Sequence, residues 1–149
     1  MGVGRLFNTL DTTGPLFLRL GLAAVFIAHG GQKLFGWFGG AGLEASLAYF
    51  EQTLGIPMIP ALLAMVAEFF GAMAILLGLL TRVAALGLTV VMAVAIFRVH
   101  LPYGFFLNWP CMPELGHGIE FNLALAAMSL SLVVTGPGKY SVDKWISEL

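Results

Sequence analysis

Four stretches of the chain are almost wholly apolar, and each is long enough to cross a lipid bilayer. They cover about residues 15–38, 59–80, 83–101 and 117–135. A transmembrane helix needs roughly 20 mostly apolar residues, and proline or glycine marks most edges of these stretches. The pattern predicts an all-α integral membrane protein in which residues 1–149 form one transmembrane four-helix bundle.

The links between these stretches differ in length and character. Only Leu80-Thr81-Arg82 joins the second stretch to the third, which makes those two helices antiparallel neighbours. The longer link between the first two stretches carries Leu43, Leu47, Phe50 and Leu54 at helical spacing. This spacing predicts a short amphipathic helix that lies at the membrane interface.

Composition agrees with a membrane location. Hydrophobic residues make up 59% of the chain and charged residues 10%, whereas soluble domains average roughly 25% charged residues. The net charge is -1 and no basic run is present, so we expect the lipid bilayer and not a nucleic acid as partner. The single cysteine, Cys111, excludes an internal disulfide.

Charges outside the apolar cores predict the orientation of the bundle. With four spans, the basic residues fall on one side: Arg5, Arg19, Arg82, Lys139 and Lys144. The opposite side carries three acids: Glu44, Glu51 and Glu114. Because short cytoplasmic loops are enriched in lysine and arginine, we expect both termini to be cytoplasmic.

Polar side chains inside the spans form the most informative pattern. Eight of them are His29, Gln32, Lys33, Glu68, Arg98, His100, Glu120 and Asn122. At about 1.5 Å of rise per residue, all eight are expected in the outer half of the membrane. Charged residues within spans are costly to insert and usually mark function.

The charges in this layer balance, and the layer has three interpretations. Lys33 and Arg98 match Glu68 and Glu120 in number, which predicts a neutral network, since an unpaired buried charge is costlier than a paired one. The network is either structural glue or the floor of a pocket for a polar-headed ligand. The third interpretation is haem held by His29 and His100, or a metal completed by Glu68 or Glu120, although none of these four residues lies in an HxxH or ExxH motif.

Several short motifs, in order, resemble the DoxX family of small four-span bacterial membrane proteins. They are Arg19-Leu20-Gly21, His29-Gly30-Gly31-Gln32-Lys33-Leu34, Glu68-Phe69-Phe70-Gly71, Gly78-Leu79-Leu80-Thr81-Arg82, His100, Gly118-Ile119-Glu120 and Gly136-Pro137-Gly138-Lys139-Tyr140-Ser141-Val142-Asp143. The resemblance covers nearly the whole chain and implies four helices in the bacterial cytoplasmic (inner) membrane. Some members are membrane subunits of thiosulfate:quinone oxidoreductases, and others are linked to redox complexes that handle thiols and oxidative stress.

The resemblance and the polar layer together predict the membrane subunit of a quinone-linked oxidoreductase. Glu68, His100 and Glu120 are the expected catalytic residues. The expected ligand-binding residues are His29, Gln32, Lys33, Arg98, Asn122, Trp37 and Trp109. With no flavin or nicotinamide fingerprint and no CxxC, electrons must come from a redox partner protein or a bound cofactor. The alternatives are a non-catalytic anchor or scaffold for a redox or stress-response partner, and a small-solute carrier; a homodimer is also expected.

Overall fold

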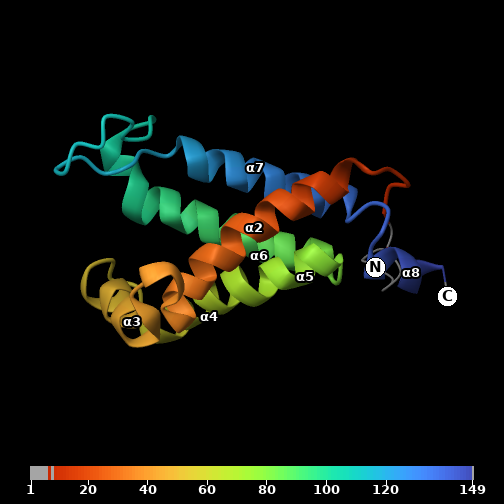
Figure 1. Ribbon diagram of the computed structural model, residues 1–149, viewed down its shortest axis with the longest axis horizontal. Coiled ribbons are helices and arrows are strands. Elements are labelled where there is room, and N and C mark those ends of the chain that lie inside the picture. The colour runs from red at the N-terminus through yellow and green to blue at the C-terminus, as the bar shows by residue number, and fades with distance from the viewer. Residues whose placement is uncertain (1–6, 8, 149) are drawn as a thin grey trace.

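The computed structural model describes Phe7 and residues 9–148 as a bundle of helices with no strand in that part of the chain. Four long helical segments run side by side, and short helices cap the two ends (Figure 1). The expected all-α bundle is confirmed, as is the short helix between the first two spans. Arg5, which contributed to the predicted orientation, lies outside the described residues.

The long segments are assembled from helices with small irregularities. In chain order the elements are α2 (Gly14–Phe35), η1 (Trp37–Gly39), α3 (Gly42–Gln52), α4 (Met58–Val66), η2 (Ala67–Gly71), α5 (Ala72–Leu77), α6 (Thr81–Ala95), η3 (Ile96–His100), η4 (Leu101–Tyr103), α7 (Glu120–Thr135) and α8 (Val142–Ser147). α4, η2 and α5 form one continuous rod, and α6, η3 and η4 form another. Both η2 and η3 are π-helical turns.

Proline and glycine set the ends of these helices. Pro15 lies in the first turn of α2, where its missing N–H costs no hydrogen bond. Gly36 ends α2 and Gly78 ends α5, each in the left-handed conformation that glycine adopts without strain. The first span therefore stops at Phe35, three residues before its expected end at Phe38, which falls in η1.

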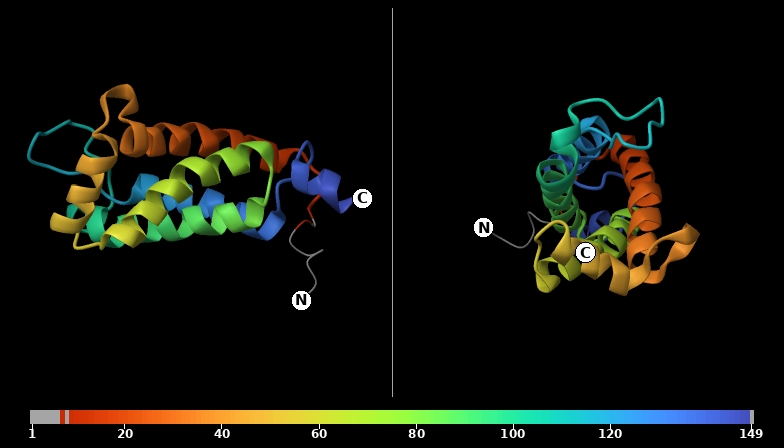
Figure 2. Two further views of the ribbon diagram at one scale, coloured as in Figure 1. Left: turned by 90° about the horizontal axis from the view of Figure 1, so that it is seen from below. Right: turned by 90° about the vertical axis from the view of Figure 1, so that its left-hand side faces the viewer.

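Three of the long segments meet the length and hydropathy expected of a membrane span. They are Gly14–Phe35, Met58–Leu77 and Thr81–Tyr103, and the fourth apolar helix, Glu120–Thr135, is shorter. The fourth segment pairs closely with α6 along its length, and α2 packs across α5, η2 and α7 (Figure 2). Apolar residues of all four segments, such as Leu22, Ile75, Leu88 and Leu132, are fully buried between them.

The bundle has two distinct ends. We call the end that carries α8 and the start of α2 the terminal end, and the end that carries α3 and residues 104–119 the loop end (Figures 1 and 2). Hydrogen bonds made by Arg19 and Asp143 close the terminal end. We call these two residues and the backbone groups that they bind the terminal cluster.

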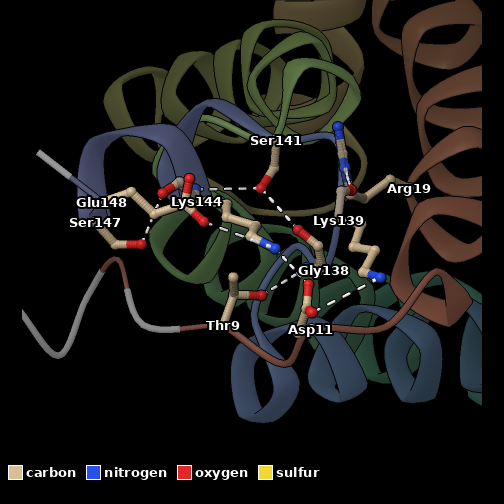
Figure 3. Close-up of polar contacts among 9 residues, drawn as sticks. All are labelled: Thr9, Asp11, Arg19, Gly138, Lys139, Ser141, Lys144, Ser147 and Glu148. Atoms are coloured by element: carbon tan, nitrogen blue, oxygen red, sulfur yellow. Dashed lines mark hydrogen bonds and ion pairs between the residues drawn. The ribbon is translucent and has the colours of Figure 1, made fainter.

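Arg19 anchors the terminal cluster from inside α2, where it is only 1% exposed. All three guanidinium nitrogens donate hydrogen bonds, and the acceptors are the backbone carbonyls of Ile75 (2.8 Å), Leu76 (2.7 Å), Pro137 (3.2 Å), Lys139 (3.4 Å) and Tyr140 (3.1 Å). The first two carbonyls belong to the last turn of α5, where helix carbonyls run out of regular helical donors. Arg19 thus ties α2 to α5 and to the segment after α7, where Figure 3 shows it beside Lys139.

Asp143 completes the terminal cluster from α8. Its carboxylate accepts hydrogen bonds from the N–H groups of Leu80 (2.7 Å) and Thr81 (2.9 Å), so it caps the start of α6. Gly78 leaves room for this arrangement, because a Cβ there would lie 2.4 Å from the Ser141 Cβ and 2.9 Å from the Arg19 guanidinium carbon. On the surface, Asp11 pairs with Lys144 and, at 3.7 Å, with Lys139 (Figure 3).

Candidate functional site

A cavity of about 1290 Å³ lies between α2, α3, the α4–η2 rod, the α6–η3 rod and the start of α7. Seven side chains in its lining are polar or charged at positions that stand out in the sequence: His29, Lys33, Glu68, Arg98, His100, His117 and Asn122. Six of these seven are residues that the sequence predicted for the site. Their helices place them in one cavity, although they are spread over almost 100 positions of the chain.

The centre of this polar group is an ion pair between Lys33 and Glu68. The Lys33 ammonium donates to both carboxylate oxygens, at 2.6 Å and 2.5 Å. Glu68 is 4% exposed, while the Lys33 side chain keeps 30% of its surface. A carboxylate this deeply buried requires such a partner, and the pair supplies one half of the charge balance that the sequence predicted.

Both π-helical turns of the long rods carry residues of this site. Glu68 lies in η2, and Arg98 and His100 lie in η3. A π-turn inserts an extra residue into a helix and rotates the side chains that follow, and such turns occur frequently at functional sites. In η3, Arg98, Val99 and His100 all line the cavity, so this turn borders it with three consecutive residues.

Gly30 allows the helices to approach closely beside the ion pair. A Cβ at this position would lie 2.8 Å from the backbone nitrogen of Phe69 and 2.9 Å from its Cα. Backbone atoms cannot move aside as the end of a flexible side chain can. The absence of a side chain at Gly30 therefore lets α2 lie against η2, so that Lys33 reaches Glu68.

The other two charged residues of the expected network, Arg98 and Glu120, do not pair with each other. Glu120 accepts a hydrogen bond from the Leu107 N–H at 2.7 Å and is not part of the cavity lining. Arg98 lines the cavity, and its guanidinium makes no hydrogen bond or ion pair with any residue that the structure describes. The expected neutral network of four charges is therefore not formed as a whole, because Glu120 begins α7 and holds the preceding loop instead.

Histidines connect the cavity to the loop formed by residues 104–119. His100 Nδ1 donates to the His117 carbonyl at 2.7 Å, and the Asn108 N–H donates to His117 Nδ1 at 3.2 Å. The Asn108 side chain is buried and bonds to Met112 and Leu115. His117 was not among the predicted site residues, because it stood at the expected start of the fourth span and not within it.

The other predicted site residues lie in different surroundings. Asn122 is buried in the lining and donates to the Met92 sulfur at 3.5 Å. Gln32, Trp37 and Trp109 are outside the lining. Trp37 packs edge-on against Phe69, with ring centroids 5.4 Å apart, and Trp109 is 75% exposed in the loop.

The remaining wall of the cavity is apolar and extends toward the terminal end. On α6 it runs from Val83 through Leu86, Val90 and Val94 to Arg98, which is about 22 Å of helix at 1.5 Å per residue. The four apolar residues in this row are each more than 40% exposed. The cavity is therefore a groove with a polar end near Glu68 and Arg98 and a long apolar side that the lipid can reach.

The described residues do not provide a ready metal site, since they contain no group of three or more histidine, cysteine or acidic side chains placed to hold an ion. His29 and His100 both line the cavity. The chemistry of this lining consists of hydrogen-bond donors, one carboxylate and a broad apolar wall.

Comparison with known proteins gives one family match and several full-length relatives. The family model described as DoxX matches residues 14–101. The inner membrane protein YqjF of Escherichia coli is 30% identical over 142 residues, covering 93% of this chain and 96% of YqjF. The inner membrane protein YphA of the same organism is 31% identical over 132 residues, covering 87% of each chain.

A more distant relative carries a name that refers to chemistry. The Bacillus subtilis protein named "Putative oxidoreductase CatD" is 26% identical over 133 residues, covering 89% of this chain and 87% of CatD. No solved structure matches the chain. The family match extends over more than half of the sequence, and it includes α2 with Lys33 and η2 with Glu68. The chain is a membrane protein that belongs to the DoxX family.

Proposed function

We propose that this protein is the membrane subunit of a quinone-linked oxidoreductase system, and that the cavity binds the quinone. The observation that carries the proposal is the composition of the cavity, in which side chains from four transmembrane segments gather at one end of an apolar groove. A quinone has a headgroup with two carbonyl oxygens and a long apolar tail. The polar end matches the headgroup, and the row from Val83 to Val94 matches the tail.

The residues of the polar end have distinct proposed roles. Lys33, with His29 and His100, donates hydrogen bonds to the carbonyl oxygens. Reduction of a quinone to a quinol consumes two electrons and two protons. Glu68 and His100 pass the protons on, and Glu120, which joins the loop to α7, extends that route to the outer face. The two electrons come from a reduced redox protein that docks on the membrane subunit.

The relatives support the membrane and the chemical class of this proposal. YqjF and YphA are named as inner membrane proteins, so we place this chain in the bacterial inner membrane. The name of CatD refers to an oxidoreductase. We orient the terminal end toward the cytoplasm, since Arg82, Lys139 and Lys144 lie there and the loop end carries Glu44, Glu51 and Glu114.

The direct test is binding of a short-chain ubiquinone analogue to the purified full-length protein in nanodiscs. Wild type should bind with a measurable Kd. Glu68→Gln and His100→Ala should weaken binding by about tenfold or more, because each removes a contact to the headgroup or to Lys33. Glu114→Gln is the matched control, since Glu114 is an exposed carboxylate of the loop outside the cavity lining.

Thermal unfolding of the same samples separates a binding defect from misfolding. The proposal fails if wild type does not bind the analogue, or if both cavity variants bind as tightly as Glu114→Gln. It also fails if the variants lose affinity only in proportion to their unfolded fraction, because the polar layer is then structural.

Exposed aromatic residues at the loop end favour a second, non-catalytic function as a scaffold. Phe106 is 71% and Trp109 75% exposed, while the buried Asn108 between them fixes the loop. A bound redox partner, or a second copy of the chain, would cover this surface. Crosslinking through the exposed Cys111 in native membranes tests this function. A redox protein that is crosslinked to wild type but not to Trp109→Ala supports docking. A chain that stays monomeric in both wild type and Trp109→Ala contradicts it.

A further inference from the structure

The charges that face the cavity do not cancel. Lys33 and Glu68 neutralise each other through two hydrogen bonds, and Glu68 is the single carboxylate among the described lining residues. Arg98 adds a second cation to the lining. Within the described part of the chain, the cavity is left with one positive charge that no acidic side chain offsets.

The acid that would have offset Arg98 is committed elsewhere. Glu120 accepts the Leu107 N–H at 2.7 Å and does not line the cavity. The guanidinium of Arg98 has five N–H donors in a planar fork, which suits two oxygen atoms at once. The Arg98 side chain is exposed, so its donors remain available to an anionic ligand.

The histidines near Arg98 add donors and no further negative charge. His117 Nδ1 accepts the Asn108 N–H, so a neutral His117 carries its proton on Nε2 and can donate from there. His100 already donates from Nδ1 to the His117 carbonyl. His29 contributes a third imidazole to the lining and forms no side-chain hydrogen bond among the described residues.

The apolar part of the groove determines the rest of the ligand. A volume of about 1290 Å³ exceeds the usual 300–1,000 Å³ of a small-molecule site. Apolar residues on α6 extend for about 22 Å away from Arg98. A small hydrophilic anion would leave this wall without a partner.

We infer that the groove binds an amphiphile whose headgroup carries an anionic oxygen, which Arg98 recognises while Lys33 and Glu68 remain paired. This inference rests on the proposed function, because it states which charge the bound quinone-type ligand carries. The preferred ligand is an acidic ring, such as a hydroxyquinone anion, over its neutral analogue.

The test compares two quinones that differ in charge but little in size. 2-Hydroxy-1,4-naphthoquinone is an anion at neutral pH, and 2-methoxy-1,4-naphthoquinone is neutral. Binding of each to the full-length protein is measured by calorimetry in phosphatidylcholine nanodiscs, which contain no lipid with net negative charge. Laurate, a carboxylate amphiphile without a ring, is the third probe.

Wild type should bind the hydroxyquinone about tenfold more tightly than the methoxyquinone, the size expected for one charge-assisted contact. Arg98→Gln should abolish that preference and leave the affinity for the methoxyquinone within about twofold. Lys139→Gln, which removes a cation at the terminal end, should change neither. Thermal unfolding of Arg98→Gln confirms that the comparison concerns folded protein.

The outcomes separate this inference from the proposed function. Equal binding of the two quinones, unaffected by Arg98→Gln, overturns the anion preference and leaves quinone binding in place. Laurate binding that depends on Arg98, without binding of either quinone, supports an anionic amphiphile and overturns the quinone proposal. No binding of any of the three probes overturns both.

Discussion

Arg19 at the terminal end donates to five backbone carbonyls, whereas Arg98 at the loop end forms no hydrogen bond with any described residue. Both are arginines in transmembrane segments of the same bundle. Arg19 is 1% exposed within closed packing, and Arg98 faces a large cavity. The donors of the first are used by the fold, and those of the second remain available to a ligand.

This difference shows how intramembrane charges divide between stability and function. A buried charge is tolerated when its hydrogen bonds are satisfied, and the terminal cluster satisfies Arg19 and Asp143 with the free ends of helices. Such a cluster also closes that end of the bundle, which argues against a continuous path for a solute. By contrast, a polar group at the edge of a cavity has donors that no other part of the fold accepts. Those donors can bind a ligand, so the group marks a candidate ligand site.

The largest expected effect is a loss of stability when Arg19 is changed. Arg19→Met should lower the free energy of unfolding by about 3–5 kcal/mol, because it removes the donor from several buried carbonyls and a nearby positive charge from the buried Asp143 carboxylate. Arg98→Met should change it by less than about 0.5 kcal/mol, as expected for an exposed side chain without partners. Denaturant unfolding in detergent, followed by circular dichroism, measures both. Equal losses from the two variants would remove the distinction between the two ends.

The next effect concerns the ion pair between Lys33 and Glu68. Glu68→Met alone should cost about 2–3 kcal/mol, somewhat less than a fully buried pair would, since Lys33 is partly exposed. The double variant Lys33→Met/Glu68→Met should recover most of that stability but not ligand binding, because apolar replacement of a buried pair is often neutral. Unfolding and quinone binding are measured on the same preparations. A double variant that still binds quinone contradicts the assigned role.

A third prediction tests whether close packing at Gly30 brings Lys33 within reach of Glu68. Gly30→Ala should destabilise the bundle by about 1–3 kcal/mol, typical of overpacking, because its Cβ meets the backbone of Phe69. The control is Gly21→Ala in the same helix, where nothing lies within 4 Å of the added Cβ. That control should be neutral or stabilising, given the higher helix propensity of alanine. Melting temperatures that fall equally for both would contradict the close approach.

The smallest effect is the pH dependence of the surface pair at the terminal end. The hydrogen bond from Lys144 lowers the pKa of Asp11, and the same bond raises the pKa of Lys144. Stabilisation by Asp11 is present above its ordinary pKa and is lost as pH falls through the lowered value. Stabilisation by Lys144 is present below its ordinary pKa and is lost as pH rises through the raised value.

The melting temperature of wild type should therefore exceed that of Asp11→Asn most near neutral pH. The difference should shrink in strong acid, in strong alkali and at high salt, which screens exposed charges. A difference that grows toward acid would contradict the direction of the Asp11 shift.

The helices and most of the charged and histidine residues of the cavity lining were predictable, because long apolar stretches and rare polar residues stand out in a sequence. Six of the eight intramembrane polar residues meet in one cavity. Glu68 lies midway along Met58–Leu77, deeper than expected, because that helix ends at Leu77 and not at Leu80. Arg98 and His100 lie in a π-turn, which apolar periodicity does not reveal.

The roles of Arg19 and Glu120 could not be read from residue types. Arg19 was counted among the basic residues of one membrane face, yet its acceptors are carbonyls 56 to 121 positions away. Backbone acceptors carry no sequence signature. Glu120 was counted as one of two acids that balance Lys33 and Arg98, whereas it accepts a backbone N–H of the loop before α7. In both cases the partner is main chain, which composition and spacing do not identify.

Native mass spectrometry tests the central claim most directly, that the loop-end cavity holds a ligand and the terminal cluster does not. The protein is purified in mild detergent from quinone-containing membranes, beside Lys33→Met/Glu68→Met. Wild type should carry a bound mass equal to the quinone of the host, and the double variant should carry none at the same folded fraction. A wild-type chain that is bare, or that carries only phospholipid, would contradict the claim and leave the polar layer as a structural element.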